Sequence, residues 1–228
     1  MKLITEEALR NRFPVFQNRV HAAEMLTRKL EIYRRTNAFI LAIPSGGVPI
    51  GYAMSSELRL PLDLVIVRKI QIPWQPEAGF GSITSGGEAY LNDDLVAALR
   101  LSDDVIDRCL EDTKKEIERR DVKFRRGRPF PRVEGMTVIV VDDGLASGYT
   151  MLAAVESVRR RGPSKVVVAV PTASEGSLGV IEETVDEAIC LNIRGGPFYA
   201  VADAYQEWHD LSDGEVLTFL KRVERDSA

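Results

Sequence analysis

Residues 138–150, with the sequence VIVVDDGLASGYT, place two carboxylates directly before a turn of small residues. Such a turn at the start of a helix exposes backbone N–H groups, which bind an anion with the help of the helix dipole. The hydroxyl groups of Ser147 and Thr150 can donate further hydrogen bonds to the same anion. Asp142 and Asp143 can accept hydrogen bonds from sugar hydroxyl groups. The pattern therefore favours a ligand that carries hydroxyl groups next to a phosphate, such as ribose 5-phosphate.

Two shorter segments also carry residue types that suit an anion. The turn Pro44-Ser45-Gly46-Gly47 follows an apolar run, and its two glycines allow the backbone to come close to a bulky anion. Arg68 and Lys69 end the next apolar run, where a guanidinium can bind phosphate through paired hydrogen bonds and an ammonium adds a mobile charge. Each segment alone also fits an ordinary surface turn or strand end, and the two aspartates also fit a tight, solvated turn.

Residues 138–150 resemble the motif that binds 5-phosphoribosyl 1-pyrophosphate (PRPP) in the type I phosphoribosyltransferases. The chain is similar in particular to bacterial and archaeal proteins described only as predicted phosphoribosyltransferases, over about residues 10–215. The resemblance implies that the ribose hydroxyls of PRPP bind to Asp142 and Asp143. It also implies that the 5′-phosphate binds to the turn that contains Gly144, Leu145, Ala146, Ser147, Gly148 and Thr150.

The resemblance implies roles for the two shorter segments as well. The pyrophosphate of PRPP would bind to Ser45, Gly46, Gly47 and Arg68, and the catalytic basic pair would be Arg68 and Lys69. The expected cofactor is Mg²⁺, which would be bound by substrate oxygens and by Asp142 and Asp143, directly or through water.

Residues 71–91 match the flexible catalytic loop of that family. The segment is rich in Gly, Ser and Pro and has no clear period, so we expect a long loop with at most a short hairpin. Its glycines at positions 79, 81, 86 and 87 would permit closure over the substrate, which would exclude water from an activated sugar. A disordered surface loop is the alternative.

Ala146 departs from one branch of the family. Members that act on 6-oxopurines carry an aspartate there, so the alanine weakens an assignment to hypoxanthine or guanine. A general acid or base would then have to come from elsewhere, and Glu77 and Glu88 in the expected loop are candidates.

Residues 195–209, GGPFYAVADAYQEWH, concentrate aromatic side chains after the last expected strand of the chain. Phe198 and Tyr199 are candidates for stacking on the nucleobase that accepts the phosphoribosyl group. The alternative is that these aromatic residues pack the C-terminal helix against the sheet.

The predicted function is Mg²⁺-dependent transfer of 5-phosphoribosyl from PRPP to a nucleobase-like acceptor, with release of pyrophosphate. One alternative is a sensor of PRPP or a nucleotide that regulates an RNA, DNA or protein partner, and another is an enzyme that uses PRPP without a nucleobase. A basic cluster leaves RNA contact open, although a solvated helix end explains it as well. Its seven members are Arg119, Arg120, Lys123, Arg125, Arg126, Arg128 and Arg132.

The elements that position these residues alternate between apolar runs and segments of helical period. Continuous β-branched runs indicate strands covered on both faces, as in a parallel sheet, and the alternation predicts a doubly wound α/β fold of about five strands. We expect strands at 38–43, 62–70, 136–141, 165–170 and 186–193, and helices at 18–36, 49–58, 102–125, 148–161, 175–184 and 213–225. The whole chain, 1–228, would form one domain with an inserted long helix at 102–128 and a small hood at 195–228.

Composition narrows the function classes. The 228 residues include 30 Lys and Arg and 34 Asp and Glu, a net charge of −4, so a broadly basic protein that coats nucleic acid is not expected. Two cysteines and two histidines fit neither a disulfide framework nor a structural zinc site. The sequence has no apolar run of membrane-spanning length and no signal-like apolar segment near Met1, so we expect a cytoplasmic location without membrane contact. The family resemblance implies a homodimer.

Overall fold

The computed structural model describes residues 1–196 and 198–226, with the side chains of residues 76 and 77 left out. Its main sheet has six strands in the order β1-β9-β8-β7-β2-β3, and every pairing is parallel. The bounds are β1 Lys2–Ile4, β9 Glu187–Arg194, β8 Lys165–Ser174, β7 Thr137–Val141, β2 Ala38–Ala42 and β3 Leu62–Leu64. The expected doubly wound α/β fold is confirmed, with β1 as a strand that the sequence pattern did not predict.

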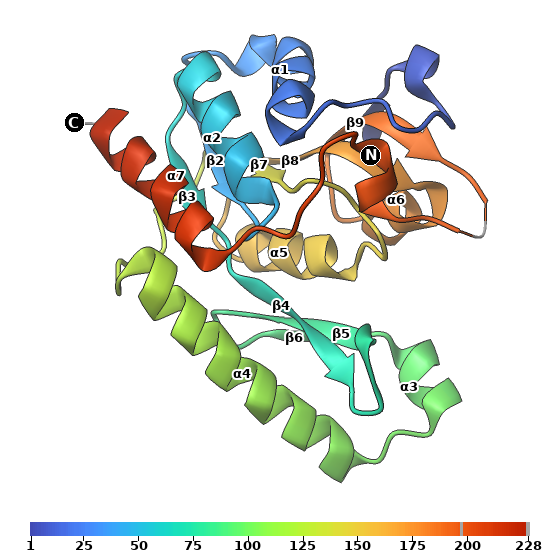
Figure 1. Cartoon of the computed structure of the whole chain (residues 1–228). Helices are drawn as coiled ribbons and strands as arrows, with labels where there is room; N and C mark the ends of the chain where they lie inside the picture. Colours follow the sequence, from blue (N-terminus) through green and yellow to red (C-terminus); the bar gives the residue numbers. More distant parts are fainter. Residues whose placement is uncertain (197, 227–228) are drawn as a thin grey trace.

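Helices cover both faces of this sheet (Figure 1). On one face lie α1 (Arg19–Lys29) and α2 (Gly47–Leu58), and on the other lie α5 (Tyr149–Arg159) and α6 (Glu175–Ile181). Successive residues of β7 alternate between the two layers, since Ile139 packs with the first pair of helices and Val140 with the second. This double burial explains why the strands are continuous apolar runs. The C-terminal helix α7 (Asp213–Asp226) packs beside α2, where the rings of Tyr52 and Phe219 lie 5.7 Å apart.

The prediction of one strand over 62–70 is wrong, because the chain changes sheets within that segment. β3 ends at Leu64, and β4 (Val67–Ile72) begins a separate antiparallel sheet with β5 (Gln75–Thr84) and β6 (Ala89–Leu91). The helices α3 (Asp93–Leu99) and α4 (Asp103–Arg125) follow, and α4 lies along this sheet, below the main sheet in Figure 1. The expected long helix is confirmed, whereas α3 was not predicted.

The expected loop at 71–91 is therefore largely strand. Gly79 and Gly81 lie inside β5, where an added Cβ would stand 2.2 Å from the Lys69 side chain and 2.5 Å from the Tyr90 carbonyl oxygen. Glycine is needed at these positions because the paired strands lie too close together for a side chain. The glycine content of the segment is therefore typical of a loop, although the segment is a strand. The sheet is held to the rest of the core by buried residues such as Phe80 and Ile83, which share a cluster with Ile117 and Phe124 of α4.

Within the described residues, no helix is both long and apolar enough to cross a membrane.

Candidate active site

The three predicted segments meet at the carboxyl edge of the parallel sheet, where ligands bind in open α/β folds. They line a cleft of about 420 Å³ beside the ends of β2 and β7. The predicted site residues in its lining are Ser45, Gly46, Arg68, Lys69, Asp142, Asp143 and Thr150. Other lining residues are Arg19, Ile43, Pro44, Val67, Arg120, Trp208, Asp210 and Leu211.

Asp143 lies at the centre of a network that joins distant parts of the chain. Its Oδ2 accepts a hydrogen bond from Nε of Arg19 at 2.8 Å, and its carbonyl oxygen accepts one from the hydroxyl of Tyr205 at 2.6 Å. The guanidinium of Arg19 also lies 3.9 Å from the ring centroid of Trp208. Burial raises the pKa of the Asp143 carboxyl, and the neighbouring Arg19 charge opposes that rise. One of the two predicted carboxylates is thus fixed in orientation by its own cation.

Asp142 has a different environment. Its Oδ1 accepts a hydrogen bond from the backbone N–H of Asp143 at 2.8 Å. Burial, followed by the charge of Asp143, raises the pKa of Asp142 well above its usual value. A carboxylate that is costly to ionise gains from hydroxyl donors or a cation, so its chemistry suits the ribose side of the predicted ligand.

Glycine is required at positions 46 and 47 because other parts of the chain lie very close to them. An added Cβ at Gly46 would lie 2.0 Å from Oδ2 of Asp143, and one at Gly47 would lie 2.5 Å from the carbonyl oxygen of Val141. The turn also contains a cis peptide bond between Pro44 and Ser45. The glycines therefore bring the turn directly against the acidic pair, which places the expected pyrophosphate and ribose subsites side by side.

The expected phosphate turn is built from backbone contacts. The N–H of Leu145 donates to the carbonyl oxygen of Thr172 at 2.9 Å, which attaches the turn to β8. Gly148 has a φ of +82° and begins α5 without a capping side chain. Ala146 and Ser147 are exposed between these two points. The turn thus ends at an uncapped helix N-terminus, which is a favourable location for an anion.

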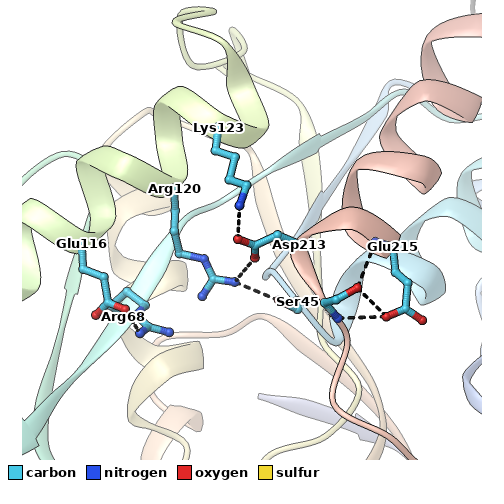
Figure 2. Close-up of polar contacts among 8 residues, drawn as sticks. Ser45, Arg68, Glu116, Arg120, Lys123, Asp213 and Glu215 are labelled. Carbon is cyan, nitrogen blue, oxygen red and sulfur yellow. Dashed lines mark hydrogen bonds and ion pairs between the residues drawn. The ribbon is translucent and has the colours of Figure 1, made fainter.

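Two arginines approach the Ser45 turn from the second sheet and from α4. Figure 2 shows Arg68 paired with Glu116 and Arg120 directed at Ser45. NH2 of Arg120 donates to Oγ of Ser45 at 2.8 Å. Sequence reasoning missed Arg120 as a site residue, because it was one member of a basic cluster with no local signal of its own. Arg19 was missed because it too has no local signal in the sequence.

The C-terminal segment adds a carboxylate to this group. Asp213 forms ion pairs with Lys123 and, at 3.8 Å, with Arg120 (Figure 2). It lies in the first turn of α7, next to a reciprocal cap in which Ser212 N and Oγ donate to Glu215 at 2.9 and 2.7 Å. These hydrogen bonds from Ser212 lower the pKa of Glu215 to about 2. The cap thus determines where α7 begins and so where Asp213 stands.

The rest of the basic cluster does not form one surface. Arg125 is buried and donates to the carbonyl oxygens of Leu64 and Pro129 at 3.1 and 2.7 Å. Arg126 and Arg128 pair with Glu224 at 3.9 and 4.0 Å. The cluster divides between the cleft, the interior and the surface near α7.

The two predicted base-stacking residues lie outside the lining of the cleft, as do Gly47 and residues 144–148 of the predicted anion-binding turns. Phe198 is 88% exposed, and the hydroxyl of Tyr199 donates to Oγ1 of Thr172 at 3.2 Å. Their role in base stacking stays a prediction. Of the two suggested acids, Glu88 accepts a hydrogen bond from the Thr84 hydroxyl, which lowers its pKa, and the side chain of Glu77 lies outside the described residues.

The sequence matches the phosphoribosyl transferase domain over residues 16–202. The chain belongs to this family. It is 36% identical over 214 residues to two Mycobacterium tuberculosis proteins, from strains CDC 1551 and H37Rv, that carry provisional names as phosphoribosyl transferases. The alignment covers 94% of this chain and 48% of each relative, so the chain spans about half the length of these curated relatives.

A solved structure supports the fold of this chain. The crystal structure of TT1426 from Thermus thermophilus matches it with a TM-score of 0.74 at 32% identity, over 91% of this chain and 98% of that chain. The predicted family is confirmed.

Proposed function

We propose that this protein transfers the 5-phosphoribosyl group of PRPP to a nucleobase-like acceptor and releases pyrophosphate, with Mg²⁺ as cofactor. The observation that carries the proposal is that Asp142, the Ser45–Gly46 turn and Arg68 line one cleft, although they lie on three separate segments. Acids for ribose hydroxyls and cations for pyrophosphate are therefore adjacent, as PRPP requires.

In the proposed mechanism the ribose hydroxyls bind to the acidic pair and the 5′-phosphate binds to the turn at 144–150. The pyrophosphate binds to the Ser45 turn, with Arg68 and Lys69 providing positive charge. The bond from C1 to the pyrophosphate oxygen breaks, and its electron pair leaves with the pyrophosphate. A ring nitrogen of the acceptor donates the pair that forms the new bond, and the N–H proton of the acceptor passes to the pyrophosphate or to solvent. The carboxylates stabilise positive charge on the ribosyl group, so catalysis is mainly electrostatic.

The donor set suits a Mg²⁺ ion that is bound mostly by its substrate. Among the described residues no group of three or more His, Cys, Asp or Glu side chains could hold a metal by itself. Asp142 and Asp143 both line the cleft with partly buried carboxylates, but Oδ2 of Asp143 already accepts a hydrogen bond from Arg19. Mg²⁺ keeps water and phosphate ligands readily, so Asp142 could hold it directly or through water. When bound, it would neutralise charge on the pyrophosphate.

The test is pyrophosphate release from PRPP with Mg²⁺, screened against adenine, guanine, hypoxanthine, xanthine, uracil and orotate. The control is the double variant Asp142→Asn/Asp143→Asn, checked for folding by circular dichroism. Release with one base that the double variant lacks would support the proposal and identify the acceptor. PRPP binding without turnover on any base would favour a sensor or another acceptor. Failure of the folded wild-type protein to bind PRPP would overturn the proposed site.

A further inference from the structure

We propose that Arg120, from the inserted helix α4, binds the pyrophosphate of PRPP together with Ser45 and Arg68. The inference rests on the proposed function and adds to it a binding residue from a helix outside the three predicted segments. Figure 2 shows Arg120 reaching from α4 to the turn of Ser45.

Distance and burial place the guanidinium in the cleft. NH2 of Arg120 lies 2.8 Å from Oγ of Ser45, and the residue is part of the cleft lining. Its side chain is 17% exposed, and the guanidinium carbon lies 5.3 Å from the ring centroid of Phe124 on the same helix. Contact of the guanidinium with the Phe124 ring restricts the conformation of this long side chain, which lowers the entropic cost of binding an anion there.

The charges around Arg120 point to an anion with more than one phosphate. Arg68 lines the same cleft, and burial followed by the charge of Arg68 lowers the pKa of Arg120. Two guanidinium groups repel each other until an anion lies between them. A pyrophosphate can accept hydrogen bonds from both guanidinium groups and from the Ser45 hydroxyl. A single phosphate is less able to reach all three donors at once.

Each arginine also has a carboxylate near it. Glu116 pairs with Arg68, and Asp213 lies 3.8 Å from Arg120, beyond hydrogen-bond distance. The carboxylates are 48% and 41% exposed, so both can turn to solvent at low cost. Among the described residues, the hydrogen-bond acceptor of Arg120 is the hydroxyl of Ser45, which leaves most of its five N–H donors for a ligand.

The alternative is that Arg120 only attaches α4 to the Ser45 turn. Two probes separate these roles, namely inorganic pyrophosphate and ribose 5-phosphate, each titrated by calorimetry with Mg²⁺. In Arg120→Ala we expect pyrophosphate affinity to fall about 10- to 100-fold, because a charged hydrogen bond is lost. Ribose 5-phosphate affinity should stay within about twofold of wild type, since the acids and the 144–150 turn are unchanged, and Arg120→Lys should retain part of the pyrophosphate affinity.

Lys123→Ala is the matched control. Lys123 lies one turn further along α4 and pairs with the same Asp213, but it is not part of the cleft lining. We expect its affinity for pyrophosphate to stay within about threefold of wild type, because only a long-range charge is lost. If Arg120→Ala does not fold, Arg120→Gln provides the same comparison with the stem retained.

The outcomes distinguish this inference from the proposed function. If wild type binds neither PRPP nor ribose 5-phosphate, the proposed function fails. If wild type binds PRPP but Arg120→Ala keeps its pyrophosphate affinity, the role of Arg120 is overturned. The role is also overturned if Arg120→Ala loses affinity for both probes equally, since a merely structural contact would give that result. It is overturned as well if Lys123→Ala loses as much pyrophosphate affinity as Arg120→Ala does.

Discussion

Nε of Arg19 lies 2.8 Å from Oδ2 of Asp143, so the first residue of α1 directly contacts an acid at the end of β7. The two side chains are only 9% and 13% exposed. Trp208 covers the guanidinium, and NH1 of Arg19 donates to the carbonyl oxygen of His209 at 3.0 Å. The pair therefore joins α1, the main sheet and the C-terminal segment at the cleft.

Arg19→Ala should destabilise the protein by about 3 kcal/mol, because it leaves a partly buried carboxylate without its cation. Urea unfolding of Arg19→Ala, Asp143→Asn and the double variant would show a coupling free energy of about 1–3 kcal/mol. Arg159→Ala is the matched control. Its pair with Asp186 has side chains 31% and 42% exposed, so its loss should cost less than about 1 kcal/mol. Additive single effects in the cycle would contradict a direct interaction.

Gly46→Ala should disrupt the acidic pair, because the new Cβ would meet the carboxylate that Arg19 holds in place. We expect a loss of about 1–3 kcal/mol in unfolding free energy, and a fall of at least about tenfold in PRPP affinity. Gly179→Ala is the control, since among the described residues no heavy atom beyond its chain neighbours and the backbone of its own helix lies within 4 Å of its Cβ position in α6. It should be neutral or stabilise the helix by up to about 1 kcal/mol. Equal PRPP binding by both variants would show that the Gly46 contact is unimportant.

The raised pKa of Asp142 predicts a pH-dependent stability. In the native state the carboxyl holds its proton more tightly than in the unfolded chain, whose pKa is near 3.8. Its favourable contribution is therefore complete below about pH 3.8 and is lost as the pH rises through the native pKa. Asp142→Asn removes this titration and can still accept from the N–H of Asp143.

The asparagine variant should accordingly be more stable than wild type at pH 7, and the difference should shrink towards pH 4. Urea unfolding of both proteins across this range measures the effect. A difference that is constant with pH, or that grows towards acid, would contradict the raised pKa of Asp142.

Tyr205→Phe should lower the free energy of unfolding by about 1–2 kcal/mol. The backbone carbonyl of Asp143 loses a hydrogen-bond donor at 2.6 Å, and the site is buried, since Tyr205 is only 5% exposed. Burial raises the pKa of Tyr205 well above its usual value, so the hydroxyl remains a donor throughout the neutral range. Thermal unfolding measures the loss. A variant as stable as wild type would show that the carbonyl finds another donor.

Phe198→Ala tests the predicted contact with the acceptor base. Because the side chain is 88% exposed, the substitution should change stability by less than about 0.5 kcal/mol. If Phe198 stacks on the base, KM for the acceptor should rise about 5- to 100-fold while PRPP affinity is kept. Unchanged steady-state kinetics would remove Phe198 from the site.

Local patterns in the sequence were enough for four of the six strands of the main sheet and for the helices that cover it. The strands β2, β7, β8 and β9 are buried on both faces. Each of them is therefore a continuous apolar run that can be recognised in the sequence. The long helix α4 was also predicted, since one side of it carries apolar residues at helical spacing. The acids and the glycine turn could be assigned to one site because parallel strands present their carboxyl ends at one edge. The basic pair Arg68 and Lys69 reaches the same cleft from β4 of the second sheet, which that rule does not cover.

The second sheet was beyond those patterns. Gly79 and Gly81 look like loop residues until the paired strand is known, and the division of 62–70 between two sheets leaves no break in the apolar run. The residue types of a segment indicate which conformations it can adopt. Strand pairing depends instead on which segment lies opposite in the folded protein.

The sequence by itself thus determined the family, the α/β architecture and the identity of the acidic pair with its turn. Only the tertiary structure decided that Arg19 holds Asp143 and that Arg120 reaches Ser45, across separations of 124 and 75 residues. The physical reason is that strand and turn signals arise from neighbours along the chain. The partner of a charged side chain is instead set by how helices pack on the sheet, and no spacing in the sequence encodes that distance.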